Sequence, residues 1–311
     1  MDQATQLSRS ALLFLSRREE LKDLATGVPA LRRIARRFIA GETLEEAVSA
    51  VKDLNARGLS VSFDHLNEAV RHPAETRDEV REYQRLLARI DQVGVRGNVS
   101  MKLTQCGLLF DRELALANAR QVVADAKRRG SFVRVDMEHG AVTQDTLDVV
   151  RTLHREFGEP HVGAVLQSYL YRTEADARAL CAERVRIRLC KGAYLEGPGV
   201  AWQDKKDVDD NFVRVMRVLL DSGVYHGIAT HDERMIEETL AYARQKQLPR
   251  GAFEFQMLYG IRRDLQERLA AEGHPVRVYV PYGRHWYPYF MRRLAERPAN
   301  VWFVMKNLVK G

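Results

Sequence analysis

Two arginines stand side by side near the end of the chain, in the stretch YPYFMRRLAERPAN at residues 287–300. The stretch has the pattern of a helix, so Arg292 and Arg293 point about 100° apart around its axis. They can still converge sideways on one anion, with Tyr289 one turn before them and Glu296 one turn after. Guanidinium groups form paired, planar hydrogen bonds to carboxylates and phosphates. The segment is therefore a candidate anion site.

The elements that must hold these arginines alternate regularly along the chain. Short β-branched runs are followed by stretches of 3.6-residue periodicity, such as residues 112–130, for which Gly130 is the expected C-terminal stop. Eight strands, each followed by a helix, predict an α/β protein with a (β/α)8 TIM barrel fold. A doubly wound sheet is less favoured because the turn after the first strand, FDHLNEAV, has no glycine. The predicted strands are residues 59–64, 98–103, 131–136, 161–168, 185–190, 224–230, 252–256 and 276–280.

Polar residues gather at the C-terminal ends of these strands, the end at which TIM barrels carry their active sites. Together they predict a mouth rich in cations and aromatic rings and poor in nucleophiles. Such a mouth suits an anionic substrate and a large anionic cofactor that supplies the chemistry. The residues are Asp64, Lys102, Asp136, Gln167, Arg188 with Lys191, Thr230 with His231, Glu254 with Gln256, and Tyr279.

Several of these positions allow two interpretations. Lys102 needs a carboxylate if it is buried, and a pair with Asp136 is either purely structural or part of a site. Arg188 precedes the basic, glycine-bearing turn KGAY, which suits a phosphate approached by backbone N–H groups, although the turn matches no phosphate-binding motif. His231 is either a mouth residue or only the start of the next helix, for which Asp232 is the better N-cap.

Composition narrows the class of protein. The chain has 311 residues, 45% of them hydrophobic and 29% charged, which is typical of a globular domain of barrel size. We expect residues 1–50 to form a helical N-terminal extension and residues 51–311 the barrel, as one domain overall. No apolar run approaches the ~20 residues of a membrane span, and the N-terminus lacks the pattern of a signal peptide. Three scattered cysteines indicate a cytoplasmic protein without disulfides or a zinc site, and no metal-binding or acyl-transfer motif is present.

The net charge of +7 raises the question of a nucleic-acid partner, but most basic residues alternate with acidic ones on helical faces. We therefore expect no nucleic-acid binding. The exception is ALRRIARRFIAG, residues 30–41, which has an apolar stripe and a basic face. It either packs on its own domain, which we favour, or lies on an anionic membrane. Its stripe is Leu31, Ile34, Ala35, Phe38 and Ile39, and its basic face is Arg32, Arg33, Arg36 and Arg37.

Six motifs together resemble those of the proline dehydrogenases, in the family's order and approximate spacing from about residue 59 to the end. They are VSMKLTQCG, VRVDMEH, RIRLCKGAY, IATHDE, FEFQMLYG, and VRVYVPYG followed by YPYFMRRLAERPAN. The resemblance implies a distorted (β/α)8 barrel that binds FAD. It also implies oxidation of L-proline to Δ1-pyrroline-5-carboxylate, by hydride transfer to the flavin N5, as the first step of proline catabolism to glutamate. The chain resembles the monofunctional bacterial type.

The resemblance further implies roles for individual residues. Arg292 and Arg293 would hold the proline carboxylate, with Lys102 as a third cation fixed by Asp136. Arg188 would lie at the flavin N5 edge and stabilise negative charge on the reduced ring. The implied catalytic residues are Asp136, Arg188 and Lys102. The implied substrate-binding residues are Lys102, Leu258, Tyr279, Tyr289, Arg292 and Arg293. No metal ligand is implied.

The implied FAD contacts come from several strand ends and from the last helix. They are Met137, Gln167, Arg188, Lys191, Gly192, Ala193, Tyr194, Thr230, His231 and Glu296. One position departs from the family pattern. The first strand is usually followed by Leu-Gly-Glu, whereas here Asn67 replaces the glycine and Glu68 occupies the place of a gate glutamate.

The implied partners, besides L-proline, are a membrane quinone as electron acceptor and a separate pyrroline-5-carboxylate dehydrogenase that receives the product. We expect the protein in the cytoplasm, with transient peripheral contact at the inner face of the membrane. Another flavin TIM-barrel oxidoreductase, similar to methylenetetrahydrofolate reductase, is the alternative function. A DNA-binding role prompted by the charge is a third and weaker one.

Overall fold

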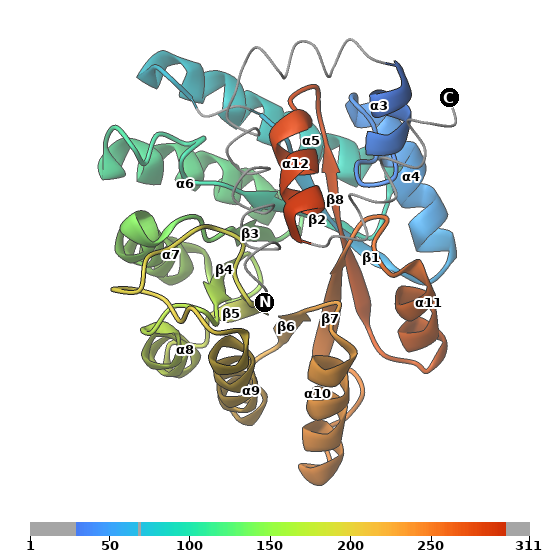
Figure 1. Cartoon of the computed structure of the whole chain (residues 1–311). Coiled ribbons are helices and arrows are strands. Elements are labelled where there is room, and N and C mark those ends of the chain that lie inside the picture. Colours follow the sequence, from blue (N-terminus) through green and yellow to red (C-terminus); the bar gives the residue numbers. More distant parts are fainter. Residues whose placement is uncertain (1–28, 68–69, 297–311) are drawn as a thin grey trace.

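The computed structural model describes residues 29–67 and 70–296, with side chains for residues 32–67 and 70–294. Eight parallel strands in this part of the chain form a closed barrel, in which each strand pairs with the next and β8 pairs with β1 (Figure 1). This confirms the predicted fold class, and every predicted strand run overlaps an observed strand. The strands are β1 Ser60–His65, β2 Gly97–Met101, β3 Val133–Val135, β4 Val162–Gln167, β5 Arg186–Cys190, β6 His226–Ala229, β7 Phe253–Leu258 and β8 Val276–Tyr282.

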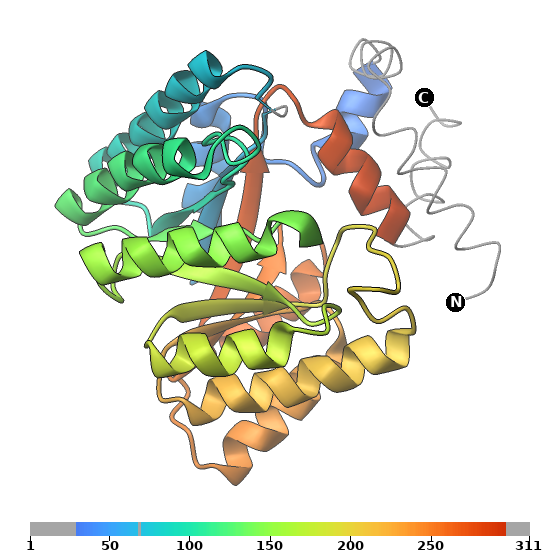
Figure 2. The same ribbon diagram turned by 90° about the vertical axis from the view of Figure 1, so that its left-hand side faces the viewer.

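A helix lies on the outside of the barrel between each strand and the next (Figures 1 and 2). Gly130 follows α6 with a φ of 62° and so acts as the predicted C-terminal stop, and Gly223 follows α9 in the same way with a φ of 68°. The connecting helices are α5 Thr76–Val93, α6 Arg112–Arg128, α7 Thr143–Phe157, α8 Thr173–Ala182, α9 Lys205–Asp221, α10 Glu233–Gln245 and α11 Arg263–Ala271. Two short 3-10 helices, η1 Pro73–Glu75 and η2 Gly140–Val142, precede α5 and α7.

The helix after β8 departs from this regular ring. Helix α4, Leu44–Ala56, precedes β1 and contacts both β1 and β8, so it fills the ring position between them. Helix α12, Tyr287–Glu296, instead lies at one end of the barrel, beside α3, Pro29–Ala35 (Figure 2). This arrangement is the barrel distortion that the family resemblance implies. Helix α4 also runs through residue 50, the expected border between extension and barrel.

Apolar packing fixes α12 in this place. Ile34, Ala35, Phe38 and Ile39 form one buried cluster with side chains of α12 and its N-terminal neighbour, including Trp286. The prediction that segment 30–41 packs on its own domain is therefore confirmed for these residues, while Leu31 lies outside the described side chains. The four arginines of the basic face stay exposed. One of these arginines, Arg36, pairs with Glu46 at 2.9 Å.

The two faces of the barrel strands differ sharply in polarity. Side chains alternate along a strand, so every second residue points into the barrel. The outer face carries apolar residues such as Val61, Val99 and Val278, and these form the main core beneath the helices. The inner face is mostly polar from one end to the other. Its residues include Ser62, Asp64, Asn98, Ser100, Arg134, Arg188, Glu254, Gln256, Arg277 and Tyr279.

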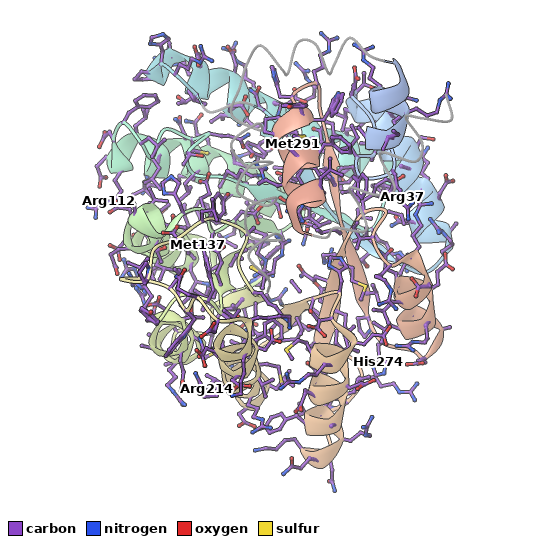
Figure 3. All side chains as sticks on the ribbon, in the orientation of Figure 1. Arg37, Arg112, Met137, Arg214, His274 and Met291 are labelled. Carbon is purple, nitrogen blue, oxygen red and sulfur yellow. The ribbon has the colours of Figure 1, made fainter. Side chains whose placement is uncertain are left out.

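Charged side chains on the outer helices have the solvated character that the sequence predicts. Arg112 on α6 and Arg214 on α9, both labelled in Figure 3, each keep 51% of their side-chain surface exposed. Within the part of the chain described, none of the helices combines the length and the apolar character needed to cross a bilayer.

Candidate active site

A cavity of about 450 Å³ opens at the C-terminal ends of the barrel strands, beneath α12. This mouth cavity brings together every residue for which the family resemblance implies a role and whose side chain the structure describes; the side chain of Glu296 lies outside that part. Glu68, the expected gate residue, also lies outside the described residues. The predicted residues lining the mouth cavity are Lys102, Asp136, Met137, Gln167, Arg188, Lys191, Gly192, Ala193, Tyr194, Thr230, His231, Leu258, Tyr279, Tyr289, Arg292 and Arg293.

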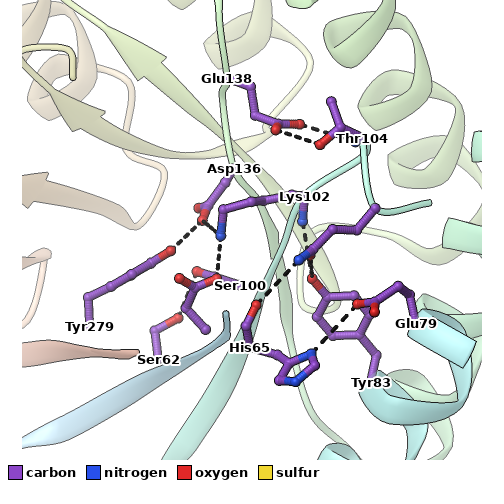
Figure 4. A network of polar contacts seen from close by, with 12 residues as sticks. Ser62, His65, Glu79, Tyr83, Ser100, Lys102, Thr104, Asp136, Glu138 and Tyr279 are labelled. Carbon is purple, nitrogen blue, oxygen red and sulfur yellow. Dashed lines mark hydrogen bonds and ion pairs between the residues drawn. The ribbon is translucent and has the colours of Figure 1, made fainter. Parts of the chain in front are cut away.

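Lys102 is held mainly by Asp64, not by Asp136 as the sequence suggested (Figure 4). Its Nζ atom donates a short hydrogen bond to Asp64 Oδ1, whereas Asp136 Oδ2 is 3.9 Å away. Asp64 on β1 and Asp136 after β3 approach Lys102 from the two strands that neighbour β2, and the Asp64 carboxylate comes closer. Burial lowers the pKa of Lys102, but the two carboxylates outweigh burial and raise it above its ordinary value. Lys102 is therefore a firmly cationic side chain.

Asp136 serves instead as the common acceptor of an arginine and a tyrosine. Arg188 Nη1 donates to Asp136 Oδ1 at 2.7 Å, and the Tyr279 hydroxyl donates to Asp136 Oδ2 at 2.8 Å. The Arg188 guanidinium also lies 5.1 Å from the centre of the Tyr279 ring. Burial, and then the charge of Asp136, raise the pKa of Tyr279 well above its ordinary value. Tyr279 therefore remains a neutral donor while Asp136 accepts.

Arg188 is only 6% exposed and has every donor nitrogen occupied. Its Nη2 atom faces Ser100 Oγ at 3.0 Å and Ser62 Oγ at 3.3 Å. Its Nε atom donates to Gln256 Oε1. A Cβ atom at Gly227 would lie 2.3 Å from the Gln256 amide, so the glycine makes room for that side chain. A rigid guanidinium fork is thus positioned beneath the mouth cavity.

Gln256 links this group to a residue that the sequence placed at the wrong end. Gln256 Nε2 donates to Glu254 Oε1 at 2.6 Å, and Glu254 also accepts from Arg277 Nε at 2.7 Å. Strand β7 extends to Leu258, two residues beyond its predicted end. Glu254 therefore lies near the start of the strand and away from the mouth cavity, which corrects its predicted place.

The adjacent arginines of α12 do reach one cavity. Arg292 is partly buried and Arg293 is 7% exposed, and both line the mouth cavity. The Arg293 guanidinium lies 5.0 Å from the centre of the Tyr289 ring. The Phe38–Phe290 ring contact, at 5.9 Å between centroids, packs this helix against segment 30–41. Segment 30–41 thus sets the direction in which the two arginines point.

The opposite wall of the mouth cavity is formed by the loops after β4 and β5. Gln167 donates to the Glu138 carbonyl at 2.8 Å, and its Oε1 accepts from the backbone N–H of Ala193 at 3.4 Å. Gly192 has a φ of 125°, and an added Cβ would lie 2.4 Å from the Tyr169 ring, so only glycine fits this turn. Burial raises the pKa of Tyr194, which lines the same wall, to about 12.

The basic and polar residues beyond this turn have defined partners. Lys191 Nζ lies 2.5 Å from Asp209 and 2.7 Å from Asp232. Asp232 is the N-cap of α10, as predicted, and accepts from the Arg234 N–H at 3.1 Å. His231 Nε2 accepts from the Leu258 N–H at 2.8 Å and lines the mouth cavity, so His231 is not the cap.

Sequence reasoning missed two serines one layer below the mouth and the role of Asp64, which lines the mouth cavity itself. Ser62 and Ser100 contact Arg188, and Asp64 was noted only as a strand-end residue and not as the partner of Lys102. The signal was present in the two-residue spacing of 62 and 64 on β1 and of 98, 100 and 102 on β2. Strict period-two counting would have put all of them inside the barrel. A serine inside a strand does not by its residue type alone indicate a functional site.

Fold and site together place the chain among the TIM-barrel proteins with a cation-lined mouth, and comparisons with known proteins specify it further. The model of the family described as proline dehydrogenase matches residues 47–306. The proline dehydrogenase of Deinococcus radiodurans is 44% identical over 309 residues, which cover 98% of this chain and 99% of that protein. Proline dehydrogenase 1 of Bacillus subtilis is 41% identical over 302 residues, covering 97% and 99%.

Larger bifunctional proteins share the same part. The bifunctional protein PutA of Escherichia coli is 28% identical over 319 residues, covering 88% of this chain and 24% of that protein. The crystal structure of proline utilization A from Bdellovibrio bacteriovorus, inactivated by N-propargylglycine, superposes with a TM-score of 0.81 at 25% identity, covering 86% of this chain and 33% of that one. The chain therefore belongs to the proline dehydrogenase family, a family of oxidoreductases that oxidise proline with a flavin cofactor. This favours proline oxidation over the reductase alternative.

The donor set of the mouth cavity fits a flavin. An isoalloxazine ring needs apolar contact on its faces and hydrogen-bonding groups at its edge, and its phosphates need cations and close backbone approach. Met137, Val165 and Ala229 supply apolar surface in the mouth cavity. Arg188 supplies a buried cation, and the turn at Gly192 supplies backbone without a side chain.

Proposed function

We propose that this chain catalyses the FAD-dependent oxidation of L-proline to Δ1-pyrroline-5-carboxylate. The observation that carries the proposal is the convergence of Lys102, Arg292 and Arg293 on one cavity that apolar and aromatic side chains also line. Three cations beside such walls suit a small ring that bears a carboxylate. FAD, when bound, supplies the hydride acceptor for the N–C5 bond of the ring.

The substrate contacts follow from the positions of these side chains. Arg292 and Arg293 would bind the proline carboxylate from α12, and Lys102 would add a third cation from the end of β2. Leu258, Tyr279 and Tyr289 would form the walls around the ring. The walls exclude water and so strengthen the ion pairs within the cavity. Asp136 would act as a positioning residue, because its two oxygens are occupied by Arg188 and Tyr279.

The cofactor contacts form a second group of proposed roles. Arg188 would lie at the flavin N5 edge, where its fixed charge stabilises negative charge on the reduced ring. The other residues would contact the ring, the ribityl chain or the pyrophosphate. These are Met137, Gln167, Lys191, Gly192, Ala193, Tyr194, Thr230, His231 and Glu296.

The electrons would pass to a membrane quinone, and the product to a separate pyrroline-5-carboxylate dehydrogenase. The apolar stripe of segment 30–41 is packed against α12, so it is not available for insertion into lipid. Contact with an anionic membrane would therefore be electrostatic, through Arg32, Arg33, Arg36 and Arg37. Binding to anionic vesicles that persists after all four are changed to glutamine would contradict this contact.

The test of the main proposal is the visible spectrum of the purified protein under anaerobic conditions. A flavin band that bleaches with L-proline, and with neither D-proline nor NADH, is the expected result. Release of FAD, not FMN, on denaturation identifies the cofactor. A band that bleaches with NADH and ignores L-proline would contradict the proposed substrate.

A further inference from the structure

A second cavity, of about 330 Å³, lies at the opposite end of the barrel, where the strands begin. We call it the floor cavity. It is lined by the first residues of several strands, among them Gly97 of β2 and Arg186 of β5, and by Arg134 one position into β3. The inner-face layer that contains Ser62, Ser100 and Arg188 separates it from the mouth cavity.

The floor cavity has a strong excess of positive charge. Four arginines line it, Arg96, Arg134, Arg186 and Arg277, against a single carboxylate, Glu254. That carboxylate is already saturated, since it accepts from Arg277 at 2.7 Å, from Gln256 at 2.6 Å and from the Tyr225 hydroxyl at 3.1 Å. Arg186 lies 3.5 Å from Glu159. Glu254 therefore does not form an ion pair with Arg96, Arg134 or Arg186.

Arg134 is the residue for which this matters most. It is 3% exposed, and no carboxylate of the described residues is within ion-pair distance of it. Its Nη1 atom donates to the backbone oxygens of Ala164, at 3.0 Å, and Arg186, at 2.6 Å, but its Nε atom has no hydrogen-bond partner among the described residues. Burial lowers the pKa of Arg134 well below its ordinary value, and the charge of Arg188 lowers it further. A buried guanidinium without a counter-charge is costly to keep.

Other donors around the floor cavity share this incomplete pairing. Ser131 Oγ is buried without a hydrogen-bond partner in the described part of the chain, and Arg186 Nε has only the ion pair with Glu159 at 3.5 Å. The guanidinium groups of Arg134 and Arg186 lie 4.7 Å and 5.8 Å from the centre of the same ring, that of Phe132. A Cβ atom at Gly163 would lie 2.7 Å from Arg134 Nη1, so the glycine leaves the space that the guanidinium needs. The chain thus holds unpaired donors close together around one cavity.

We propose that the floor cavity binds one small oxyanion, a phosphate or carboxylate group, between Arg134 and Arg186 with the Ser131 hydroxyl as a further donor. Guanidinium groups recognise both oxyanions through paired hydrogen bonds, and the anion supplies the counter-charge that Arg134 lacks. This site is separate from the mouth cavity and requires no step of proline oxidation.

The test is calorimetric titration of the flavin-loaded protein with inorganic phosphate, and separately with acetate, at low ionic strength. The variants are Arg134→Gln, Arg186→Gln, Arg293→Gln in the mouth cavity, and Arg155→Gln on the exposed surface of α7 as a control with the same change in charge. We expect a saturable site in the unchanged protein that keeps its affinity in Arg155→Gln and in Arg293→Gln, so it is distinct from anion binding at the mouth cavity, which Arg293→Gln weakens. The affinity falls at least tenfold in Arg134→Gln and in Arg186→Gln. The anion that binds with the higher affinity shows whether the site prefers a phosphate or a carboxylate group.

Three results would overturn the proposal. The first is no saturable binding of either anion, in which case water alone occupies the floor cavity. The second is equal affinity in Arg134→Gln, Arg186→Gln and Arg155→Gln. The third is binding that is lost in Arg293→Gln alone, which would assign the anion to the mouth cavity. Far-ultraviolet circular dichroism confirms that each variant is folded, and if Arg134→Gln does not fold, Arg186→Gln and Ser131→Ala decide the matter.

Discussion

The mouth and the floor of this barrel are built from the same strand faces, two residues apart, and carry nearly the same polar unit. At the mouth, Asp136 accepts from Arg188 and Tyr279; at the floor, Glu254 accepts from Arg277 and Tyr225. A carboxylate that binds one arginine and one tyrosine is therefore not sufficient for an active site.

What distinguishes the mouth is the structure added above the strands. Helix α12 places two more arginines over the cavity, and the turn at Gly192 brings backbone to its other wall. Apolar residues such as Met137 and Leu258 lie between them. The floor cavity is lined by strand starts and by the loops that precede them, and none of its described lining residues belongs to a helix. Substrate binding would therefore depend on α12 and the loops, whereas the strand residues hold the charged side chains in position.

The largest effect should follow from breaking the part that only the mouth has. Arg292→Ala is expected to lower kcat/KM for L-proline by roughly 100- to 1000-fold, mostly through KM, because the loss of one partner of a partly buried ion pair costs about 3–4 kcal/mol. Arg292→Lys keeps the charge without the planar fork and should recover part of the loss. Steady-state kinetics with Arg284→Ala, an exposed arginine just before α12, as the control measures this. An unchanged KM in Arg292→Ala would refute the carboxylate assignment.

A smaller effect is expected from cutting the connection between the two regions. Gln256 joins Arg188 of the mouth to Glu254 of the floor. Gln256→Leu leaves a hydrogen bond to a charged group unmade on each side, about 1.5–3 kcal/mol apiece. We expect kcat to fall by roughly 10- to 100-fold with a smaller change in KM, because Arg188 loses its orientation while the α12 arginines remain.

The measurement that checks this separates kcat from KM and records the flavin spectrum. A purely structural role would lower the melting temperature and leave the kcat of the folded fraction unchanged. Asn118→Leu provides a control, since Asn118 is also a buried amide side chain that donates two hydrogen bonds, but it lies on α6 and does not line the mouth cavity.

Sequence predicted the mouth much better than it predicted the layer beneath. Cations, aromatic rings and glycine at strand ends are distinctive residue types in a recognisable order, and apart from Glu254 all the described members of the predicted site line one cavity. Ser62 and Ser100 are ordinary in type and gain meaning only from the register of β1 against β2. Lys102 was given Asp136 as its main partner because pairing was judged by strand order, whereas the distances between side chains favour Asp64. The exchange of α4 and α12 in the helical ring depends on long-range packing that local periodicity does not report.

Asp64→Asn tests the support of Lys102, with a modest expected effect. Asp64 and Asp136 raise the pKa of Lys102 against burial, so removal of the nearer carboxylate lets burial lower it. A group with a lowered pKa loses its proton at a lower pH. The alkaline fall of kcat/KM for L-proline should therefore begin at a lower pH in the variant. Comparing variant and unchanged protein at each pH cancels the titration of proline itself, and identical profiles would contradict the role of Asp64.

The smallest effect concerns His226, which lies on β6 beside the floor. His226 Nδ1 accepts from the Ile187 N–H at 3.0 Å, and its Nε2 is 2.9 Å from Ser222 Oγ and 3.7 Å from Cys181. Burial, and then the charge of Arg134, lower the pKa of His226 from 6.5 to about 3. Between pH 6.5 and pH 3 the unfolded chain binds a proton at His226 that the folded protein does not bind. The stability that comes from a neutral, buried His226 is therefore complete above pH 6.5 and is lost as the pH falls toward 3.

Urea unfolding at pH 7 and pH 5.5 should show a decrease of about 1 kcal/mol from this group. His226→Asn keeps an acceptor for the Ile187 N–H and removes the titration, so its stability should change less over the same interval. The difference between the two proteins isolates His226 from the carboxylates that titrate in both. An equal pH dependence would contradict the lowered pKa. The two ends of the barrel would thus respond oppositely to charge, since the mouth fails when it loses a cation and the region beside the floor fails when it gains one.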